Sequence, residues 1–221
     1  MIKNKFPELY PFLTDSVWRT IRSVQGAARW MKNRYSPQVQ AKINPYSTCF
    51  SHCSCWFLQN LLPDFYDTLT PDDVTGEINS SIYQQFAKRH PAIGQWGASR
   101  YRGKLNQLWH VQEKYLNDKM QKARTNLKAV FNNAMTIQKI EEALQRGPVI
   151  VNTSPMYRRK RLGHIMLIVG YEPDTETWII DDPFGDFREH YKTGHINQGN
   201  DLPVSVSEFE RVRGSMAIYA V

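Results

Sequence analysis

The sequence predicts an α+β protein, with helices in the first part of the chain and a mostly antiparallel sheet in the last third. Two observations predict this order. In the first part, apolar residues recur every three to four positions, the period of an α-helix; after residue 147, short β-branched runs alternate with turn residues. The 221 residues are 41% hydrophobic and 12% aromatic, which suffices for a packed core and excludes a disordered chain.

The predicted helices follow one another through the first part of the chain. An amphipathic helix between Asp15 and Tyr35 has an apolar stripe, which we expect to pack on the rest of the molecule with its arginines outward. A buried helix runs from Cys49 to Leu62 and stops at Pro63, and another begins at Thr70-Pro71. Further helices are expected at residues 81–89 and about 114–131, with a loop-rich block at residues 89–104.

The last third of the chain has the pattern of a sheet. Thr136 caps a short helix that ends before Gly147. The runs that follow are rich in Val and Ile and are bounded by turn residues, which is typical of strands. Strands are expected at residues 148–151, 164–171, 178–180 and 216–221.

Charge and cysteine content limit the partners and the compartment. An excess of 28 Lys and Arg over 21 Asp and Glu gives a net charge of +7 and a pI near 9.3, which favours an anionic partner without selecting one. The three cysteines lie within seven residues, Cys49–Cys55, so they cannot build a disulfide framework and indicate a reducing compartment. No signal-like start and no apolar run of about 18 residues is present, so we expect a soluble, cytoplasmic protein.

Cys49 occupies the position where its helix most favours an ionised thiol. It follows a proline-containing loop and begins the helix, where unpaired N–H groups and the helix dipole stabilise a thiolate. We therefore expect Cys49 to be a nucleophile, and Cys53 and Cys55 to lie in the core. Two alternatives stay open: all three are small buried hydrophobes, or they join His52 in a zinc site, which the absence of a CxxC pair disfavours.

His164 is the expected general base because a hairpin places a carboxylate beside it. A turn at residues 173–175 pairs residues whose numbers sum to about 348, which brings His164 within two positions of Asp182. Asp182 then completes a Cys-His-Asp triad, whereas Asp181 points to the opposite face. The other histidines lack such a setting and are expected on the surface or in loops. The basic run at residues 158–161 is either a solvated loop or a rim that attracts an anionic substrate segment.

Three segments, in this order along the chain, resemble the papain-like cysteine peptidases, most closely the bacteriocin-leader (double-glycine leader) peptidases and their bacterial and phage relatives. The segments are Thr48-Cys49 with the following apolar helix, residues 140–151, and Gly163–Tyr171 with the later Asp181-Asp182-Pro183. The resemblance covers roughly residues 40–221 and implies a papain-like fold, in which a helical N-terminal half carrying the nucleophile packs on the C-terminal sheet. It divides the chain into an N-terminal helical extension, residues 1–35, and a catalytic domain, residues 36–221.

The chain departs from this family beside the nucleophile. The family usually has a glutamine about six residues before the cysteine, whose amide stabilises the oxyanion, and position 43 is Ile here. Asn44, five residues before Cys49, is the expected substitute, and Gln40 is the alternative. Phe50 also stands where the leader peptidases often have a small residue.

The function expected from these features is a cysteine peptidase-like hydrolase that cleaves a peptide or related amide bond. Cys49 is the nucleophile, His164 the base and then the acid, and Asp182 the residue that orients His164; Asn44 and the Cys49 backbone N–H are the oxyanion donors. The substrate is a protein, an isopeptide or a peptidoglycan crosslink, and no cofactor or metal ion is expected. The alternative is a catalytically silent peptidase-like fold that serves as a basic binding module for nucleic acid or a protein partner. The oligomeric state stays open, as does non-classical export or phage delivery.

Overall fold

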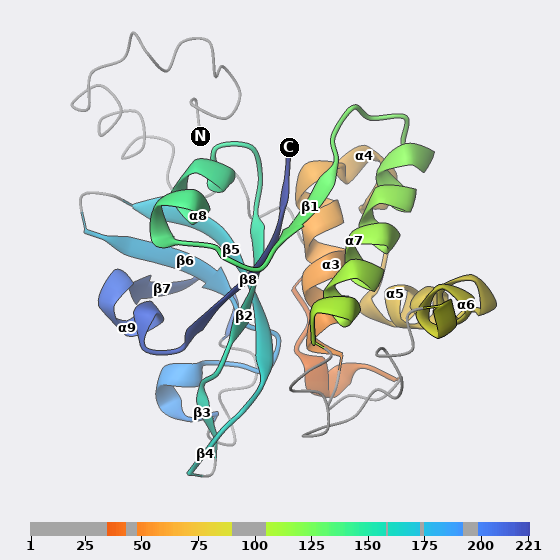
Figure 1. Ribbon diagram of the computed structural model, residues 1–221. Coiled ribbons are helices and arrows are strands. Elements are labelled where there is room, and N and C mark those ends of the chain that lie inside the picture. Colours follow the sequence, from red (N-terminus) through yellow and green to blue (C-terminus); the bar gives the residue numbers. More distant parts are fainter. Residues whose placement is uncertain (1–34, 43–47, 90–104, 158, 173–174, 192–198) are drawn as a thin grey trace, which may run out of the picture.

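A six-stranded sheet lies between two groups of helices in the computed structural model, which describes residues 35–42, 48–89, 105–157, 159–172, 175–191 and 199–221 (Figure 1). The strand order is β1-β8-β2-β5-β6-β7, and every neighbouring pair is antiparallel. The expected α+β class and antiparallel sheet are therefore present. The helix expected between Asp15 and Tyr35 and most of the loop-rich block at residues 89–104 lie outside the described residues.

The elements have the following bounds. The helices are α3 (Cys49–Leu61), α4 (Pro63–Tyr66), α5 (Pro71–Ile78), α6 (Ser81–Arg89), α7 (Leu105–Lys122), α8 (Ile137–Leu144) and α9 (Val206–Glu210), with 3-10 turns η3 (Gln38–Gln40) and η6 (Phe187–Glu189). The strands of the main sheet are β1 (Ala129–Asn132), β2 (Val149–Thr153), β5 (His164–Glu172), β6 (Thr177–Asp181), β7 (Leu202–Ser205) and β8 (Arg213–Ala220). The strands β3 (Met156–Tyr157) and β4 (Lys160–Arg161) form a separate hairpin.

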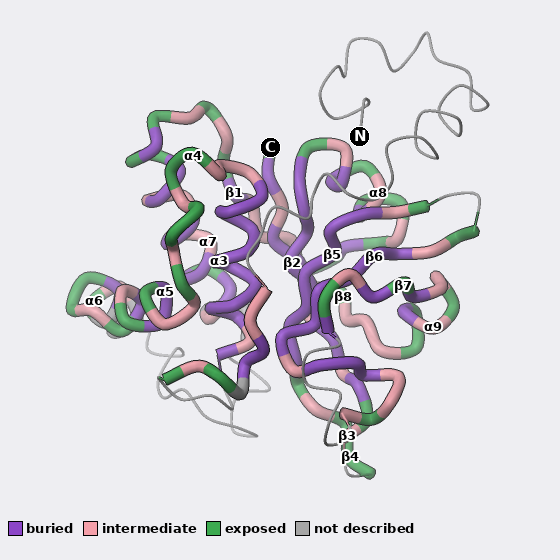
Figure 2. The backbone as a smooth tube through the Cα atoms, turned by 180° about the vertical axis from the view of Figure 1, so that it is seen from behind, coloured by how far each residue is buried: buried purple, intermediate pink, exposed green. Residues whose placement is uncertain are grey.

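Helix α3 runs through the interior, and its residues 50–60 are all buried. It ends where expected, because Pro63 has no N–H group to continue the helix and instead begins α4. The helix packs on β5 and β2 of the sheet, and α5 and α7 cover its other sides (Figures 1 and 2). Within the described part of the chain, no helix is long and apolar enough to span a membrane.

The sheet is buried on both faces, because alternate residues of its central strands enter two different cores. Ile165, Leu167 and Val169 of β5 pack in the core that α3 and α7 cover. Met166 and Ile168 of the same strand pack in a second core, beneath α8 and α9. Strand β5 therefore links the two halves of the molecule, and its first residue is His164.

The hairpin of β5 and β6 has the predicted register. Leu167 pairs with Asp181 and Ile168 with Ile180, so the paired numbers sum to 348, and an irregularity after Ile168 raises the sum by one from Gly170 onward. This register confirms the prediction at the end of the hairpin where β5 begins, since it brings the residue after β6 close to the first residue of β5.

One helix prediction was wrong at both ends. The helix expected at about residues 114–131 is α7, which starts at Leu105 and stops at Lys122. The chain turns at Arg124, whose φ of 52° is incompatible with a continuing helix, and residues 129–132 then form β1 beside β8. The Asn117 side chain pairs with both backbone polar groups of Ala129, at 2.9 Å each, and docks this strand on α7. Sheet pairing thus overrides the local helical pattern.

Candidate functional site

His164 and Asp182 form a buried pair where β5 begins and β6 has just ended. The Nε2 atom of His164 lies 2.7 Å from Oδ1 of Asp182, and the two residues are 5% and 0% exposed. Asp181, one residue earlier, accepts a hydrogen bond from the backbone N–H of Asp201 at 2.8 Å. The structure thus brings His164 together with the carboxylate that was expected beside it.

Every polar group of Asp182 has a hydrogen-bond partner. Besides His164, its carboxylate accepts from the backbone N–H of Phe184 at 2.9 Å and from the Tyr191 hydroxyl at 3.0 Å. Its backbone N–H donates to Gly199 O at 2.7 Å, and its carbonyl accepts from the Tyr35 hydroxyl at 2.8 Å. A Cβ atom at residue 199 would lie 2.0 Å from the Asp182 carbonyl oxygen, so only glycine fits there. The carboxylate is therefore held in a fixed position.

Cys49 is the first residue of α3 and is partly exposed. The start of this helix has no side-chain cap: the Thr48 hydroxyl makes no bond to the helix and is buried without a partner. The first N–H groups of a helix have no intrahelical acceptors, so those of α3 are left for another group. An anion beside Cys49 would meet these N–H groups and the positive end of the helix dipole.

The electrostatics of His164 favour its protonated form. Burial by itself lowers the pKa of this imidazole, but the charge and hydrogen bond of Asp182, followed by the interaction with the Cys49 side chain, outweigh burial and raise the pKa to about 10. Because Nε2 faces Asp182, Nδ1 is the nitrogen available to Cys49. The imidazolium therefore places a positive charge beside the Cys49 side chain.

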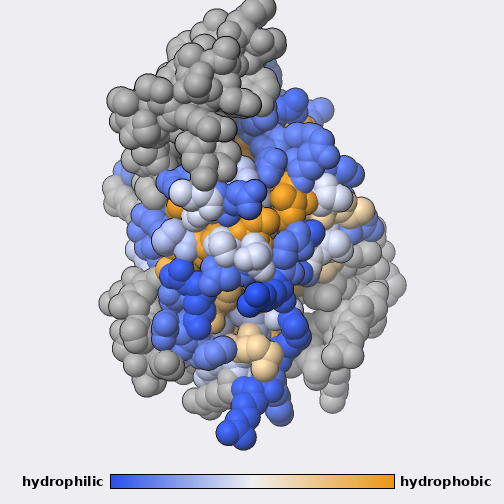
Figure 3. All heavy atoms as spheres, turned by 90° about the vertical axis from the view of Figure 1, so that its left-hand side faces the viewer, coloured by the Kyte–Doolittle hydropathy of each residue, from blue (hydrophilic) through white to orange (hydrophobic). Residues whose placement is uncertain are grey.

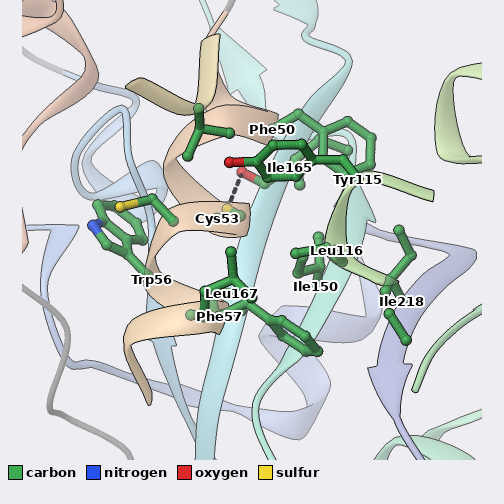
Figure 4. Close-up of a cluster of buried hydrophobic side chains, with 14 of the residues drawn as sticks. Phe50, Cys53, Trp56, Phe57, Tyr115, Leu116, Ile150, Ile165, Leu167 and Ile218 are labelled. Atoms are coloured by element: carbon green, nitrogen blue, oxygen red, sulfur yellow. Dashed lines mark hydrogen bonds between the residues drawn. The ribbon is translucent and has the colours of Figure 1, made fainter. Parts of the chain in front are cut away.

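The other two cysteines lie in the core, as expected. Cys53 and Cys55 are both 0% exposed; the thiol of Cys53 donates to Ile165 O at 3.6 Å (Figure 4) and that of Cys55 to Leu69 O at 3.2 Å. Burial raises the pKa of each thiol, far above the ordinary value for Cys53. They point to different neighbours, and no three His, Cys, Asp or Glu side chains gather as a metal site among the residues that the structure describes.

The expectation for the remaining histidines was wrong for His52. This side chain is 1% exposed inside α3, its Nδ1 lies 2.9 Å from Thr48 O, and its ring meets Trp56 edge-on. Burial lowers its pKa to about 4 and outweighs the opposing effects of the Thr48 carbonyl and the Asp72 charge, so it stays neutral. His110 and His190 are exposed, as expected, and His90 and His195 lie outside the described residues.

A buried glutamine that the sequence did not single out lies beside the Asp182 loop. Gln38 is 2% exposed, its backbone N–H donates to Pro183 O at 2.6 Å, and its side-chain oxygen is buried without a partner. Gln40 is exposed, and Asn44 lies outside the described residues. Gln38 stands eleven residues before Cys49, so no spacing rule marked it; its only signal is a carboxamide that precedes this cysteine.

Three aromatic side chains beside His164 were also missed. The rings of Phe184 and Tyr191 lie 6.3 and 6.0 Å from the imidazole, and Tyr157 contacts both rings. Tyr191 reaches this position because His190 and Tyr191 have φ values of 55° and 53°, which turn the chain back after η6. Consecutive left-handed residues other than glycine are uncommon and leave no reliable mark in a sequence.

Comparison with known proteins places the chain in a family. A family model described as the Peptidase_C39 like family matches residues 32–200, which include Cys49, His164 and Asp182. No curated protein matches the chain. The resemblance to papain-like cysteine peptidases is thereby confirmed at the level of the family, although the match does not select the leader-peptidase branch. The chain belongs to the Peptidase_C39 like family.

Proposed function

We propose that the protein is a cysteine peptidase that hydrolyses a peptide or related amide bond with Cys49, His164 and Asp182. One observation carries the proposal: a buried His164–Asp182 pair, 2.7 Å apart, interacts with the one partly exposed cysteine of the described chain, at an uncapped helix start. A structural histidine in a core does not need a carboxylate that two further hydrogen bonds hold in place.

The reaction follows from the protonation states of the pair. The Cys49 thiolate attacks the carbonyl carbon, the carbonyl oxygen becomes an oxyanion, and protonated His164 gives its proton to the leaving amine as the C–N bond breaks. Neutral His164 then takes a proton from water, which attacks the thioester and releases the acid. The imidazolium and the thiolate are regenerated together. Asp182 keeps the imidazole oriented throughout and stabilises its charge.

The oxyanion requires hydrogen-bond donors beside Cys49. The backbone N–H of Cys49 is one, since the start of α3 carries no side-chain cap. Asn44 stays a predicted second donor. Gln38 is a further candidate through its side-chain Nε2 group, because its backbone is bonded to the residue after Asp182; its unpartnered side-chain oxygen accepts hydrogen bonds and cannot serve the oxyanion.

The bond that is cleaved belongs to a protein, an isopeptide or a peptidoglycan crosslink, as expected from the resemblance. The alternative is a silent peptidase-like fold that binds nucleic acid or a protein partner through its basic surface. The full set of hydrogen bonds around Asp182 supports catalysis over this alternative, because a binding module has no use for an oriented imidazolium.

Cleavage of a peptide library, followed by mass spectrometry, tests the proposal. The wild-type protein and Cys53→Ala should produce the same cleavages, and Cys49→Ala should produce none. Cys53→Ala is the matched control, since it removes a thiol from the same helix one turn further on. Cleavage that survives in folded Cys49→Ala, or none by the wild type on peptide, isopeptide and peptidoglycan substrates, would overturn the proposal.

A further inference from the structure

We infer that the β3–β4 hairpin is a docking surface for a carboxylate-bearing segment of the substrate, beside the proposed catalytic centre. The inference rests on the proposed function and names the chemical class of substrate. The hairpin carries cations in succession, at Arg159, Lys160 and Arg161, and all three side chains are exposed. It forms the hydrophilic projection at the lower end of the molecule (Figures 1 and 3).

The charges of this hairpin are not compensated within the described part of the chain. Arg161 donates to two neutral acceptors, Ser154 O at 3.1 Å and Arg211 O at 3.2 Å, so it is held in place while its charge remains available. Other arginines of the same half are paired: Arg188 with Asp186 at 2.7 Å and Arg213 with Glu210 at 2.9 Å. The hairpin is therefore different from an ordinary surface on which charges of both signs alternate.

A layer of aromatic rings connects the hairpin to the proposed catalytic centre. Tyr157 of β3 lies edge-on to Phe184 and Tyr191, with ring centroids 5.6 and 6.1 Å apart. These two rings in turn contact the ring of His164. One side chain on the hairpin is thus separated from the imidazole by a single layer of side chains. A substrate held at Cys49 would pass within reach of the hairpin cations.

The ligand that fits this surface best is an acidic peptide segment. Guanidinium groups bind carboxylates through two parallel hydrogen bonds, and partly exposed rings contact the apolar parts of a peptide. Nucleic acid is a weaker fit, because sequence-independent binding needs cations spread along several phosphates. These three cations instead stand together on one short hairpin beside the proposed catalytic centre. Attraction of this kind reaches about 10 Å at 0.1 M salt and about 30 Å at 0.01 M.

A pair of alkylating reagents tests whether the charges act at the nucleophile. Iodoacetate is an anion and iodoacetamide is its neutral counterpart, and both modify a thiolate. In Arg159→Glu/Lys160→Glu, the ratio of iodoacetate to iodoacetamide rates at Cys49 should fall about threefold or more at ~10 mM salt and return to the wild-type value at ~0.5 M. The matched control is Lys122→Glu/Lys128→Glu, which reverses two exposed charges at the C-terminal end of α7 and in the loop that follows it, away from the hairpin. This control should leave the ratio unchanged.

Docking is measured directly with two fluorescein-labelled decapeptides that differ only in having Glu or Gln at alternate positions. The Cys49→Ala protein should bind the Glu peptide more tightly, and the added hairpin substitutions should abolish that preference. An unchanged reagent ratio or an unchanged preference for the Glu peptide overturns the inference. Loss of binding to a 20-base-pair DNA without either change would identify a nucleic-acid surface and overturn it as well.

Failure of the proposed function has a different signature in the same measurements. If iodoacetamide modifies Cys49 no faster in the wild-type protein than in His164→Ala, the catalytic pair is not formed. The preference of the protein for the Glu peptide over the Gln peptide is measured without any alkylation. It therefore tests the docking surface independently of the catalytic pair.

Discussion

The site at the start of α3 and the interior of α3 place the same types of side chain, cysteine and histidine, in opposite electrostatic settings. Cys49, at the start, is partly exposed and interacts with His164, whereas Cys53, one turn later, is fully buried and donates to Ile165 O. The histidines show the same contrast: burial lowers the pKa of His52 within the helix to about 4, but Asp182 raises that of His164 to about 10. Burial alone therefore suppresses charge, and a facing carboxylate reverses its effect.

The largest loss of activity is expected from a change to the Asp182 carboxylate. Asp182→Asn should lower kcat/KM by about 10²–10⁴-fold, because the amide no longer stabilises the imidazolium and permits the wrong tautomer. Asp181→Asn is the matched control, since its carboxylate contacts the Asp201 N–H, and it should cost less than about tenfold. Equal losses in the two folded variants would mean that Asp182 acts only in packing.

Gln38→Ala tests which carboxamide side chain stabilises the oxyanion. If Gln38 stabilises the oxyanion, kcat should fall about 10²-fold with little change in KM, because the interaction forms only in the transition state. Gln40→Ala changes an exposed glutamine two residues away and should be neutral. A large loss in Asn44→Ala together with full activity in Gln38→Ala would assign the donor to Asn44 instead.

Cys53→Ser tests the interior of the helix. The shorter C–O bond should leave the hydroxyl poorly placed for Ile165 O, and an unsatisfied buried hydroxyl costs about 1–3 kcal/mol. Calorimetry should show a Tm lower by about 2–4 °C for each kcal/mol, with the alkylation rate of Cys49 unchanged. A variant that keeps its Tm but loses Cys49 reactivity would contradict the division between a reactive start and a structural interior.

Tyr191→Phe should have the smallest effect, a reduction of a few-fold in kcat. The substitution keeps the ring contacts of Tyr191 and removes its hydrogen bond to Asp182. The loss should disappear in an Asp182→Asn background, because a double-mutant cycle isolates the coupling between the two groups. Tyr157→Phe, in the same aromatic layer, is the control, and an equal loss in that variant would show that the effect does not depend on the hydrogen bond to Asp182.

Much of this site follows from local patterns, and the remainder depends on long-range contacts. The hairpin register that joins His164 to Asp182 follows from a turn and strand alternation, and the start of α3 follows from a loop that meets an apolar helix. Gln38 could not be predicted, because its place depends on a bond to Pro183, far along the chain. Tyr191 depends on two left-handed residues, and β1 on pairing with β8, which no local pattern encodes.

The pH dependence of Cys49 alkylation by iodoacetamide, followed by mass spectrometry alongside Cys53, tests the central claim most directly. His164 holds its proton up to about pH 10, so below that pH its positive charge stabilises a thiolate at Cys49. We predict that wild-type Cys49 reacts rapidly at pH 6 and that its rate inflects near pH 10 as His164 loses its proton, while Cys53 stays inert. In His164→Ala the rate at pH 6 should fall about 100-fold and rise with the ordinary thiol titration near pH 8.5. A wild-type Cys49 that follows the same single titration as His164→Ala would contradict the account.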